Sequence, residues 1–453
     1  MKLVIIGAGP GGYETAVLAA KRGIEVTIIS DGPLGGTCLN EGCIPTKALC
    51  RSAEVLETVR NSAAYGIDTA EWSFDFAKAS ARKEEVVGQL RSGVEFLLSG
   101  KGITLVRGKA SIVDSGTVKV GDVEYHADYI IIATGSHAAV PPIPGIDLPG
   151  VLTSAEMLSL EEVPSRLCVI GAGVIGLEFA SIFKSFGSEV SVLEYCKDIL
   201  PRFDTDLAKR LKQSLSKRGI SIETSASVQS ISPAAGGGLE VSFLKKDKEF
   251  TVEADKVLVA TGRRPNVDTL NLADAGIAFS PKGIVTDGQM RTSVPNIFAV
   301  GDVTGGIMLA HAATAQGIVA LDAICDEAGL EHEKNNINLS VIPAAVFTVP
   351  EVATVGLTQE DCEERGIPYL SLKSMYRANG KAVSMGSPEG YCKILVARDD
   401  ERILGCHIFG EHAADIIQEI TALCSRGGSL SDLRGVIHAH PTLSEVVLSA
   451  ARG

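Results

Sequence analysis

The feature that most constrains the fold is a short pattern that occurs twice along the chain. Residues 3–20 combine a run of apolar residues, a glycine turn and a helix-like stretch, and residues 167–181 repeat this order. An apolar run that leads through a glycine turn into a helix is typical of the βαβ unit. The glycines are spaced as Gly-x-Gly-x-x-Gly, with Gly7, Gly9 and Gly12 in the first copy and Gly171, Gly173 and Gly176 in the second.

Each glycine of such a turn has its own task. The first makes the tight turn, the second lets a pyrophosphate approach the backbone, and the third lets the helix pack closely on the strand. The pyrophosphate then lies at the positive end of the helix. Later apolar runs end in Thr134-Gly135 and in Thr261-Gly262, at matching offsets behind the two copies. The repeat therefore predicts two Rossmann-like nucleotide-binding domains.

The remaining sequence predicts an α/β fold with a third, C-terminal α+β domain. A chain of 453 residues has room for about three domains. A helix is expected over residues 204–218, a β-meander around 236–238, antiparallel strands at 392–397 and 403–409, and helices at 413–426 and 443–451. We expect one nucleotide-binding domain from residues 1–145 and 270–340, a second from 146–269, and an interface domain from 341–453.

Acidic residues at strand ends indicate the cofactors. Glu194 closes a strand about 20 residues after the second glycine turn, where a carboxylate accepts hydrogen bonds from a ribose 2′-OH and repels a 2′-phosphate, so NAD is favoured over NADP. Asp302, after Gly301, suits a carboxylate that binds the ribityl hydroxyls of FAD. The plain alternative for both is a strand-end acid without a ligand. In the first copy the corresponding strand ends in Ser30, with Asp31 next.

A pair of cysteines five positions apart, Cys38 and Cys43, is the most informative local feature. Gly42 makes an irregular turn between them easy, and Pro45 suits the first turn of a helix. A helix N-terminus stabilises a thiolate, which is the reactive form of cysteine. Ten cysteines in the whole chain are too few for a disulfide scaffold, so the pair is expected to be catalytic. Zinc would need two further ligands, and none lie nearby in the sequence.

With these motifs in order, the chain resembles the pyridine nucleotide–disulfide oxidoreductases. The resemblance covers essentially the whole chain and includes both glycine turns, the stretch from Gly35 to Lys47, the two Thr-Gly turns, and the Gly301-Asp302 motif. It ends with His-Ala-His-Pro-Thr-Leu-Ser-Glu at residues 438–445. This last stretch and Glu194 narrow the resemblance to the dihydrolipoamide dehydrogenase branch.

The resemblance implies FAD in the first domain and NAD in the second. Cys43 would lie against the flavin ring, Cys38 would exchange with the substrate, and Lys47 would lie near flavin N5 and pair with Glu178. The family usually carries a glutamate where this chain has Ser30, so the Ser30 hydroxyl or Asp31 would take over the ribose contact. The residues expected to bind the cofactors beyond the glycine turns are Gly36, Thr37, Thr134, Gly135, Gly262, Gly301 and Asp302.

The resemblance also implies that His440 and Glu445 form an acid–base dyad. Dithiol oxidation needs a base that removes a thiol proton. Residues five apart do not face each other on one helix, but Pro441 makes His440 a residue before the helix, whose side chain can turn toward Glu445. In the family this dyad serves the disulfide of the other subunit, which implies a homodimer. A lipoyl-bearing protein of a 2-oxoacid dehydrogenase or glycine cleavage complex would be the partner.

Composition excludes several other classes of function. The formal net charge is −13, and the sequence has no Lys/Arg run, so no nucleic-acid or anionic-membrane partner is expected. The chain begins directly with a strand pattern, so no signal peptide is expected and a cytoplasmic location is predicted. A glutathione-type reductase would prefer NADPH, and a mercuric-type reductase would end in vicinal cysteines, whereas this chain ends Ala-Ala-Arg-Gly. A flavoprotein that only senses NADH would not need the full set of Cys38, Cys43, Lys47, His440 and Glu445.

Overall fold

The computed structural model describes residues 1–268 and 270–453, and it divides into two compact units. The first contains Met1–Ala48, Lys78–Ala139 and Gly262–Leu339, and the second contains Leu49–Ala77, Val140–Thr261 and Ser340–Gly453. The predicted boundary at residue 269 lies outside the described residues. The division into three domains stays a prediction, because the second unit holds both the second nucleotide-binding sheet and the C-terminal sheet.

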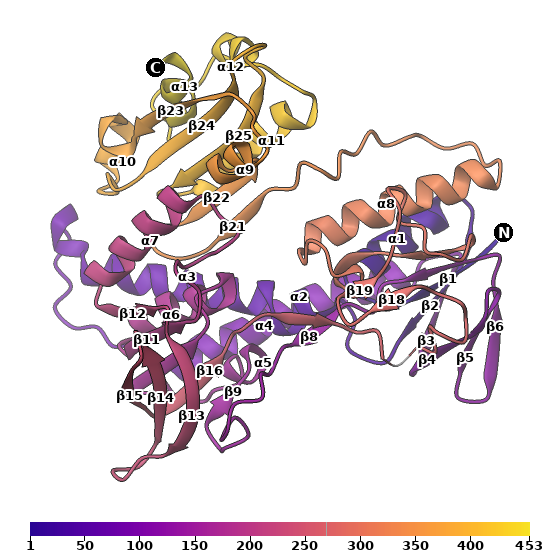
Figure 1. Cartoon of the computed structure of the whole chain (residues 1–453), viewed down its shortest axis with the longest axis horizontal. Coiled ribbons are helices and arrows are strands. Elements are labelled where there is room, and N and C mark those ends of the chain that lie inside the picture. The colour runs from indigo at the N-terminus through magenta and orange to yellow at the C-terminus, as the bar shows by residue number, and fades with distance from the viewer. Residues whose placement is uncertain (269) are drawn as a thin grey trace. The chain divides into compact units, whose positions relative to one another are not determined.

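The first unit is built on a five-stranded parallel sheet in the order β20-β7-β1-β2-β3. Apart from the edge strand of residues 103–107, its strands are apolar runs that are largely buried on both faces, as is typical of parallel sheets. Helices α1 (Pro10–Lys21) and α8 (Ala310–Glu327) lie side by side (Figure 1). The strands are β1 (Lys2–Ile6), β2 (Glu25–Ser30), β3 (Ile103–Arg107), β7 (Tyr129–Ile132) and β20 (Ile297–Ala299), and a small sheet adds β4 (Ala110–Asp114), β5 (Thr117–Val120) and β6 (Val123–His126).

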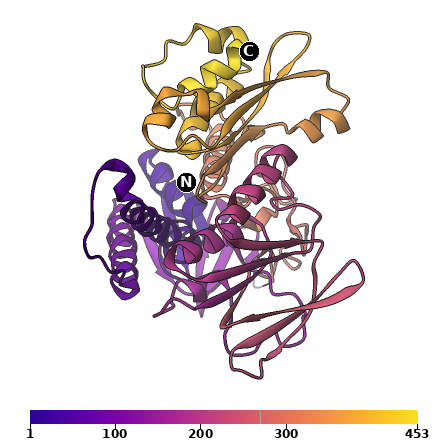
Figure 2. The same cartoon turned by 90° about the vertical axis from the view of Figure 1, so that its left-hand side faces the viewer.

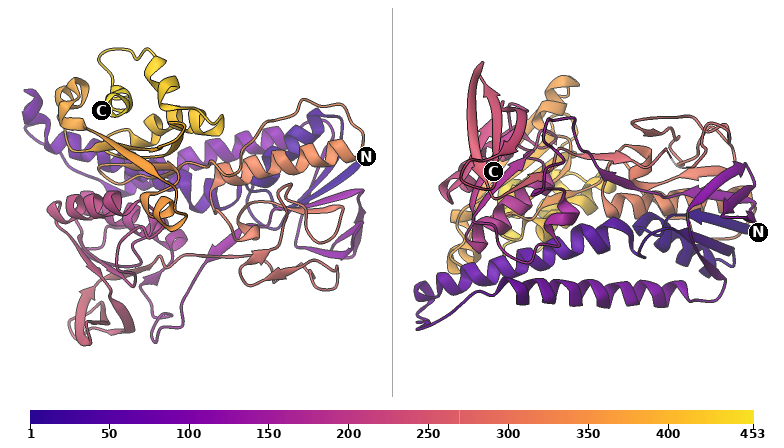
Figure 3. Two further views of the ribbon diagram at one scale, coloured as in Figure 1. Left: turned by 45° about the horizontal axis from the view of Figure 1, so that its top comes forward. Right: turned by 90° about the horizontal axis from the view of Figure 1, so that it is seen from below.

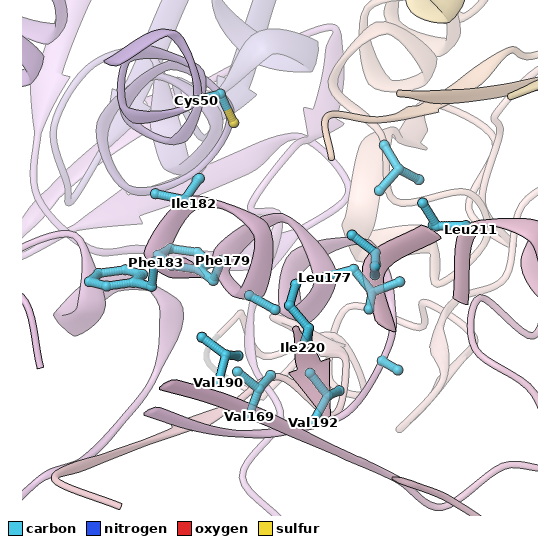
Figure 4. Packing of buried hydrophobic residues seen from close by; sticks show 14 of the residues in the cluster. Cys50, Val169, Leu177, Phe179, Ile182, Phe183, Val190, Val192, Leu211 and Ile220 are labelled. Atoms are coloured by element: carbon cyan, nitrogen blue, oxygen red, sulfur yellow. The ribbon is translucent and has the colours of Figure 1, made fainter. Parts of the chain in front are cut away.

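The second unit repeats this architecture, which confirms the predicted tandem of Rossmann-like folds. Its parallel sheet has the order β12-β11-β10-β16-β9, and the meander β13-β14-β15 (pink in Figure 2) takes the place of the small sheet. Helix α6 (Val174–Phe186) packs its apolar side chains on this sheet, as Figure 4 shows for Leu177 and Phe179 above Val169 and Val192. The strands are β9 (Val151–Leu152), β10 (Arg166–Ile170), β11 (Glu189–Glu194), β12 (Ile220–Thr224), β13 (Ser227–Pro233), β14 (Leu239–Lys245), β15 (Lys248–Ala254) and β16 (Lys256–Val259).

An antiparallel sheet of order β21-β22-β25-β24-β23 forms the C-terminal part of the second unit. Its central strands are buried on both faces. The yellow helices α11 (Ala413–Ser425) and α13 (Glu445–Arg452) pack on one face (Figure 3), and side chains of the other face join the core of the second nucleotide-binding sheet. The strands are β21 (Ala344–Val346), β22 (Val352–Gly356), β23 (Tyr369–Met375), β24 (Tyr391–Ala397) and β25 (Ile403–Phe409).

A buried ion pair crosses that second face. The ammonium of Lys393 on β24 lies 2.7 Å from the carboxylate of Asp204, the N-cap of α7 (Thr205–Lys217), and both side chains are essentially inaccessible. Loss of either partner would leave the other charge buried and unpaired, which is strongly destabilising. The pair therefore fixes α7 against the C-terminal sheet.

The remaining elements connect these layers. They are α4 (Phe76–Leu98), α5 (Ser154–Met157), α9 (Gln359–Glu364), α10 (Gly380–Ser384), α12 (Leu430–Gly435), η1 (Ser62–Tyr65), η2 (Gly301–Thr304), η3 (Tyr376–Ala378), β18 (Phe279–Ser280) and β19 (Gly283–Ile284), with α2, α3, β8 and β17 introduced below. Within the described ranges, no helix combines the length and the apolar character needed to cross a bilayer.

Candidate functional site

The two cysteines of the predicted redox pair lie on two helices that meet at a glycine. Cys38 is in the short helix α2 (Gly36–Glu41), and Cys43 is the first residue of α3 (Cys43–Arg60). Gly42 separates the helices, since its φ of −143° and ψ of −112° are not helical. The sequence predicted one helix start with an irregular turn, and the structure has two helices instead.

Helix α2 is held firmly against the first glycine turn. A Cβ on Gly36 would lie 2.7 Å from the Cα of Gly9, so only glycine permits this approach. The side-chain amide of Asn40 donates hydrogen bonds to the carbonyls of Leu34 and Gly36, and Arg91 donates to its oxygen at 2.8 Å. Cys38 is therefore presented from a fixed support, which suits a group that must meet a substrate in one geometry.

The two thiols interact directly. The hydrogen bond to Cys43 and partial burial hold the pKa of the Cys38 thiol well above its ordinary value, and the nearby negative charge of Cys43 acts in the same direction. The ammonium of Lys47 acts in the opposite direction.

The first glycine turn has the properties of a pyrophosphate site. A Cβ on Gly12 would lie 1.9 Å from the carbonyl oxygen of Gly7, so the helix packs tightly on the turn. A Cβ on Gly9 would by contrast make only an ordinary contact, 3.9 Å from the Cα of Gly36. In the described structure no side chain caps the N-terminus of α1, and its first turn carries no acidic residue. An anion can therefore bind the free backbone N–H groups, and this donor set fits FAD.

Other predicted FAD-binding residues surround the same sheet edge. Asn266 binds the turn at Thr134 and Gly135 with two hydrogen bonds. Its side-chain amide donates to the carbonyl of Thr134 at 2.8 Å, and its backbone N–H donates to the carbonyl of Gly135 at 2.9 Å. The backbone N–H of Gly301, next to Asp302, donates to the buried Gln316 at 2.7 Å.

Ser30 and Asp31 differ in their accessibility. The Ser30 hydroxyl is buried and donates to the carbonyl of Gly32 at 3.0 Å, which Arg107 also binds. Asp31 is exposed. Of the two, Asp31 has the accessible carboxylate, so it is the better candidate for the ribose contact.

The second glycine turn fits NAD in the same way. Gly173 has no neighbour within 4 Å of an added Cβ, and in the described structure no side chain caps α6. Glu194 lies beside this turn, and its two carboxylate oxygens accept hydrogen bonds from the backbone N–H groups of Ala172 and Cys196, both at 2.6 Å. Each oxygen has a second lone pair, so Glu194 can hold the turn and still accept from a ribose hydroxyl.

His440 and Glu445, which the resemblance implied to be a dyad, lie within hydrogen-bonding distance of each other. Nδ1 of His440 lies 3.0 and 3.2 Å from the two oxygens of Glu445, and the backbone N–H of Thr442 donates to the same carboxylate at 2.9 Å. The Thr442 N–H and His440 lower the pKa of Glu445. The imidazole is 78% exposed, so its other nitrogen is open to a substrate.

Two predicted partners, Lys47 and Glu178, belong to different compact units. Glu178 is buried on α6, and its carboxylate accepts a hydrogen bond from the backbone N–H of Phe347 at 3.0 Å. The pairing of Lys47 with Glu178 stays a prediction.

The structure adds contacts that the sequence did not indicate. Ser136 and Arg263 bind Asp302, and buried His438 lies 3.0 Å from Glu419 on α11. Ser136 follows a strand-and-glycine motif, and Arg263 directly follows Gly262, so a search for polar residues next to these turns would have found both. His438 and Glu419 carry no comparable signal.

Comparison with known proteins agrees with this arrangement. Residues 1–317 match the family model described as pyridine nucleotide-disulphide oxidoreductase, and residues 342–451 match the dimerisation domain of the same family. Among curated relatives, the dihydrolipoyl dehydrogenase of Staphylococcus aureus is 38% identical over 99% of this chain and 95% of its own length. That of Chlamydia muridarum is 40% identical with the same coverage.

Solved structures give the same result. The HOCl-induced flavoprotein disulfide reductase RclA from Escherichia coli is similar with a TM-score of 0.86 and 32% identity, covering 100% of this chain and 99% of its own. LpdA from Mycobacterium tuberculosis is similar with a TM-score of 0.90 and 26% identity, again covering 100% of this chain and 99% of its own. The fold, the two glycine turns and the cysteine pair together with these matches establish that the chain belongs to the pyridine nucleotide-disulphide oxidoreductase family.

Proposed function

We propose that the protein oxidises protein-bound dihydrolipoamide to lipoamide and reduces NAD to NADH, as a dihydrolipoyl dehydrogenase. The observation that carries this proposal is the combination of the Cys38–Cys43 pair with an exposed His440–Glu445 dyad in a chain 38–40% identical to dihydrolipoyl dehydrogenases over its whole length. When bound, FAD would relay the electron pair from the cysteines to NAD.

Four residues of the chain would carry out the reaction with the substrate: His440, Glu445, Cys38 and Cys43. His440 removes a proton from one substrate thiol, and the thiolate attacks Sγ of Cys38 in the oxidised pair, which breaks the Cys38–Cys43 bond and leaves Cys43 as a thiolate. The sulfur of the second substrate thiol then displaces Sγ of Cys38, and lipoamide leaves. Of the two protons that the substrate gives up, one passes to the released Cys38 and the other stays on His440 until it goes to solvent, while the thiolate of Cys43 lies at the N-terminus of α3. Glu445 orients the imidazole and stabilises its positive charge.

The active form would be a homodimer in which each dyad serves the cysteine pair of the other subunit. The match to a dimerisation domain supports this, as does the strong exposure of His440 and of Ile437, which is 96% exposed. We propose a cytoplasmic location and, as partner, a lipoyl-bearing protein of a 2-oxoacid dehydrogenase or glycine cleavage complex. The names of the relatives support the substrate class.

An anaerobic absorbance titration tests the proposal. Dihydrolipoamide added to the purified flavoprotein should produce a long-wavelength absorbance band, and NAD added next should remove it while NADH appears. A flavin that responds to NADH but ignores dihydrolipoamide would reject the substrate and retain the cofactors.

The second candidate is a reductase that acts on another disulfide. The similarity to RclA, described as a flavoprotein disulfide reductase, favours it. NADH-driven reduction of a panel of disulfides, compared with lipoamide at equal concentration, separates the two. Lipoamide should be reduced fastest, and a different preferred disulfide would make this second candidate the correct one.

A further inference from the structure

Two short strands carry the chain out of the first compact unit and back into it. Strand β8 (Ser136–Ala138) is followed by the exit after Ala139, and β17 (Arg263–Pro265) follows the return at Gly262. The two strands pair in antiparallel register, with Ser136 opposite Pro265 and Arg263 opposite Ala138. The backbone N–H of Ala139 donates to the carbonyl of Gly262 at 2.9 Å and closes the ladder. We refer to residues 136–139 and 262–265 as the crossing ribbon.

The crossing ribbon is bound to the aspartate assigned to FAD. The hydroxyl of Ser136 donates to Oδ2 of Asp302 at 2.5 Å. Arg263 donates from Nε to that hydroxyl and from Nη2 to the carbonyl of Ser136, both at 2.7 Å. Nε of Arg263 also lies 3.8 Å from Oδ2 of Asp302. The guanidinium of Arg263 thus contacts both Ser136, on the paired strand, and Asp302.

These contacts leave Asp302 little freedom. Its side chain is 23% exposed and that of Arg263 is 16% exposed, so water competes weakly with the network. The contacts with Ser136 and Arg263 engage Oδ2, which leaves Oδ1 available to accept from a hydroxyl of the flavin side chain. A carboxylate held in one orientation before binding avoids the entropy cost of being ordered by the ligand.

We propose that Ser136 and Arg263 are positioning residues for the flavin site, and that through Asp302 they couple retention of FAD to the order of the crossing ribbon. This inference rests on the FAD assignment of the proposed function and not on its substrate. Charge-assisted hydrogen bonds of this kind correspond to roughly ten- to hundredfold in an equilibrium constant. The ribbon and the flavin should therefore stabilise each other.

The test uses the FAD-loaded protein with three variants, Ser136→Ala, Arg263→Gln and Arg263→Lys, and Arg264→Gln as the matched control. Arg264 is the next residue of the same strand and is exposed. Flavin retention is measured by equilibrium dialysis, the flavin environment by its absorbance spectrum, and the order of the ribbon by amide hydrogen exchange of residues 136–139 and 262–265.

Ser136→Ala and Arg263→Gln should each weaken FAD binding about tenfold, alter the flavin spectrum and speed ribbon exchange. Because they share one network, their combination should cost less than the product of the two effects. Arg263→Lys should restore part of the retention, and Arg264→Gln should match the wild type.

Unchanged FAD retention in both Ser136→Ala and Arg263→Gln would overturn the inference. Faster ribbon exchange with normal retention and spectrum would overturn it as well, because the network would then only stabilise the ribbon. The readouts are independent of lipoamide. A protein that binds FAD but does not turn over lipoamide therefore rejects the proposed substrate and still tests this inference, whereas a protein without flavin rejects both.

Discussion

At the scale of single residues, Glu445 holds the proposed acid–base dyad together. It is the first residue of α13, where a helix N-terminus favours a carboxylate. It accepts the Thr442 N–H and faces His440 at the same time. A carboxylate held in this way sets the orientation of the imidazole, whose far nitrogen stays exposed, as the proposed proton transfer requires.

Replacement of the dyad should therefore separate the two halves of the reaction. His440→Ala should lower lipoamide turnover by about 10²- to 10⁴-fold, the usual contribution of a general base. NADH-driven reduction of a one-electron dye should stay near the wild-type rate, because it bypasses the substrate thiol. Steady-state kinetics of both reactions with each variant provide the measurement.

His412→Asn is the matched control for this experiment. His412 is another exposed histidine with a carboxylate neighbour, Asp415 at 3.6 Å, and asparagine tolerates its left-handed backbone. The control should keep both activities. An equal loss of lipoamide and dye reduction in His440→Ala would contradict the role of the base.

The residue scale also shows what the sequence could and could not reveal. His440 and Glu445 are five positions apart, and the family resemblance implied their contact, which the proline between them makes possible. Ser136 lies 127 positions from Arg263 and 166 from Asp302, and only the folded sheet brings them together. Single-sequence patterns report local periodicity and carry no information on such long-range pairs.

At the scale of elements, periodicity predicted the regular helices and strands well. The helix expected at 204–218 is α7 with Asp204 as its N-cap, and both predicted C-terminal strands are present. The break between α2 and α3 was only partly predicted; it lies at Gly42, where an added Cβ would lie 2.9 Å from the carbonyl oxygen of Thr37.

The N-terminus of α11 holds a carboxyl group whose charge is unfavourable. Burial raises the pKa of Glu351 to about 7, and the neighbouring Glu411 and Asp415 act in the same direction. The backbone N–H of Ala414, which donates to Glu351 at 3.0 Å, and the nearby His412 oppose the shift. The folded protein therefore holds this proton more tightly than the unfolded chain does.

The free energy of unfolding should consequently fall as the pH rises from about 4.5 to about 7, where the unfolded chain releases the proton first. Glu351→Gln removes this loss and still offers an acceptor to Ala414. The variant should be more stable than the wild type at pH 8, by up to about 3 kcal/mol, and should show no gain at pH 4.5. Thermal unfolding at both pH values measures this. An equal change in stability at both pH values would contradict the raised pKa of Glu351.

At the scale of the whole molecule, the repeat that first suggested two nucleotide-binding domains extends further than the glycine turns. Both parallel sheets have the same strand order, and each has a three-stranded antiparallel insertion at the same point. The sequence predicted this duplication because it is local to each copy. The boundaries between domains are harder to predict from the sequence, because they depend on which sheets share a core. Val352 and Phe409 of the C-terminal sheet, for example, belong to the core of the second nucleotide-binding sheet.

The proposed dimer can be tested through its exposed apolar residues. Ile437 is 96% exposed and Val436 40% exposed, directly before the segment that carries the dyad. An isoleucine left so open in one chain suits a subunit interface, where its burial would contribute about 1.5–3 kcal/mol per subunit. A charge at this position would be buried without a partner.

Ile437→Lys should therefore shift the protein toward monomers in light scattering and abolish most lipoamide turnover, because each dyad would lose the cysteine pair of the other subunit. NADH-driven dye reduction should persist, since it needs only one chain. Val285→Lys is the matched control, an aliphatic residue 61% exposed in the first unit, and should leave mass and both activities unchanged. A monomeric Ile437→Lys with full lipoamide turnover would show that the dyad acts within its own chain, and an unchanged dimer would place the interface elsewhere.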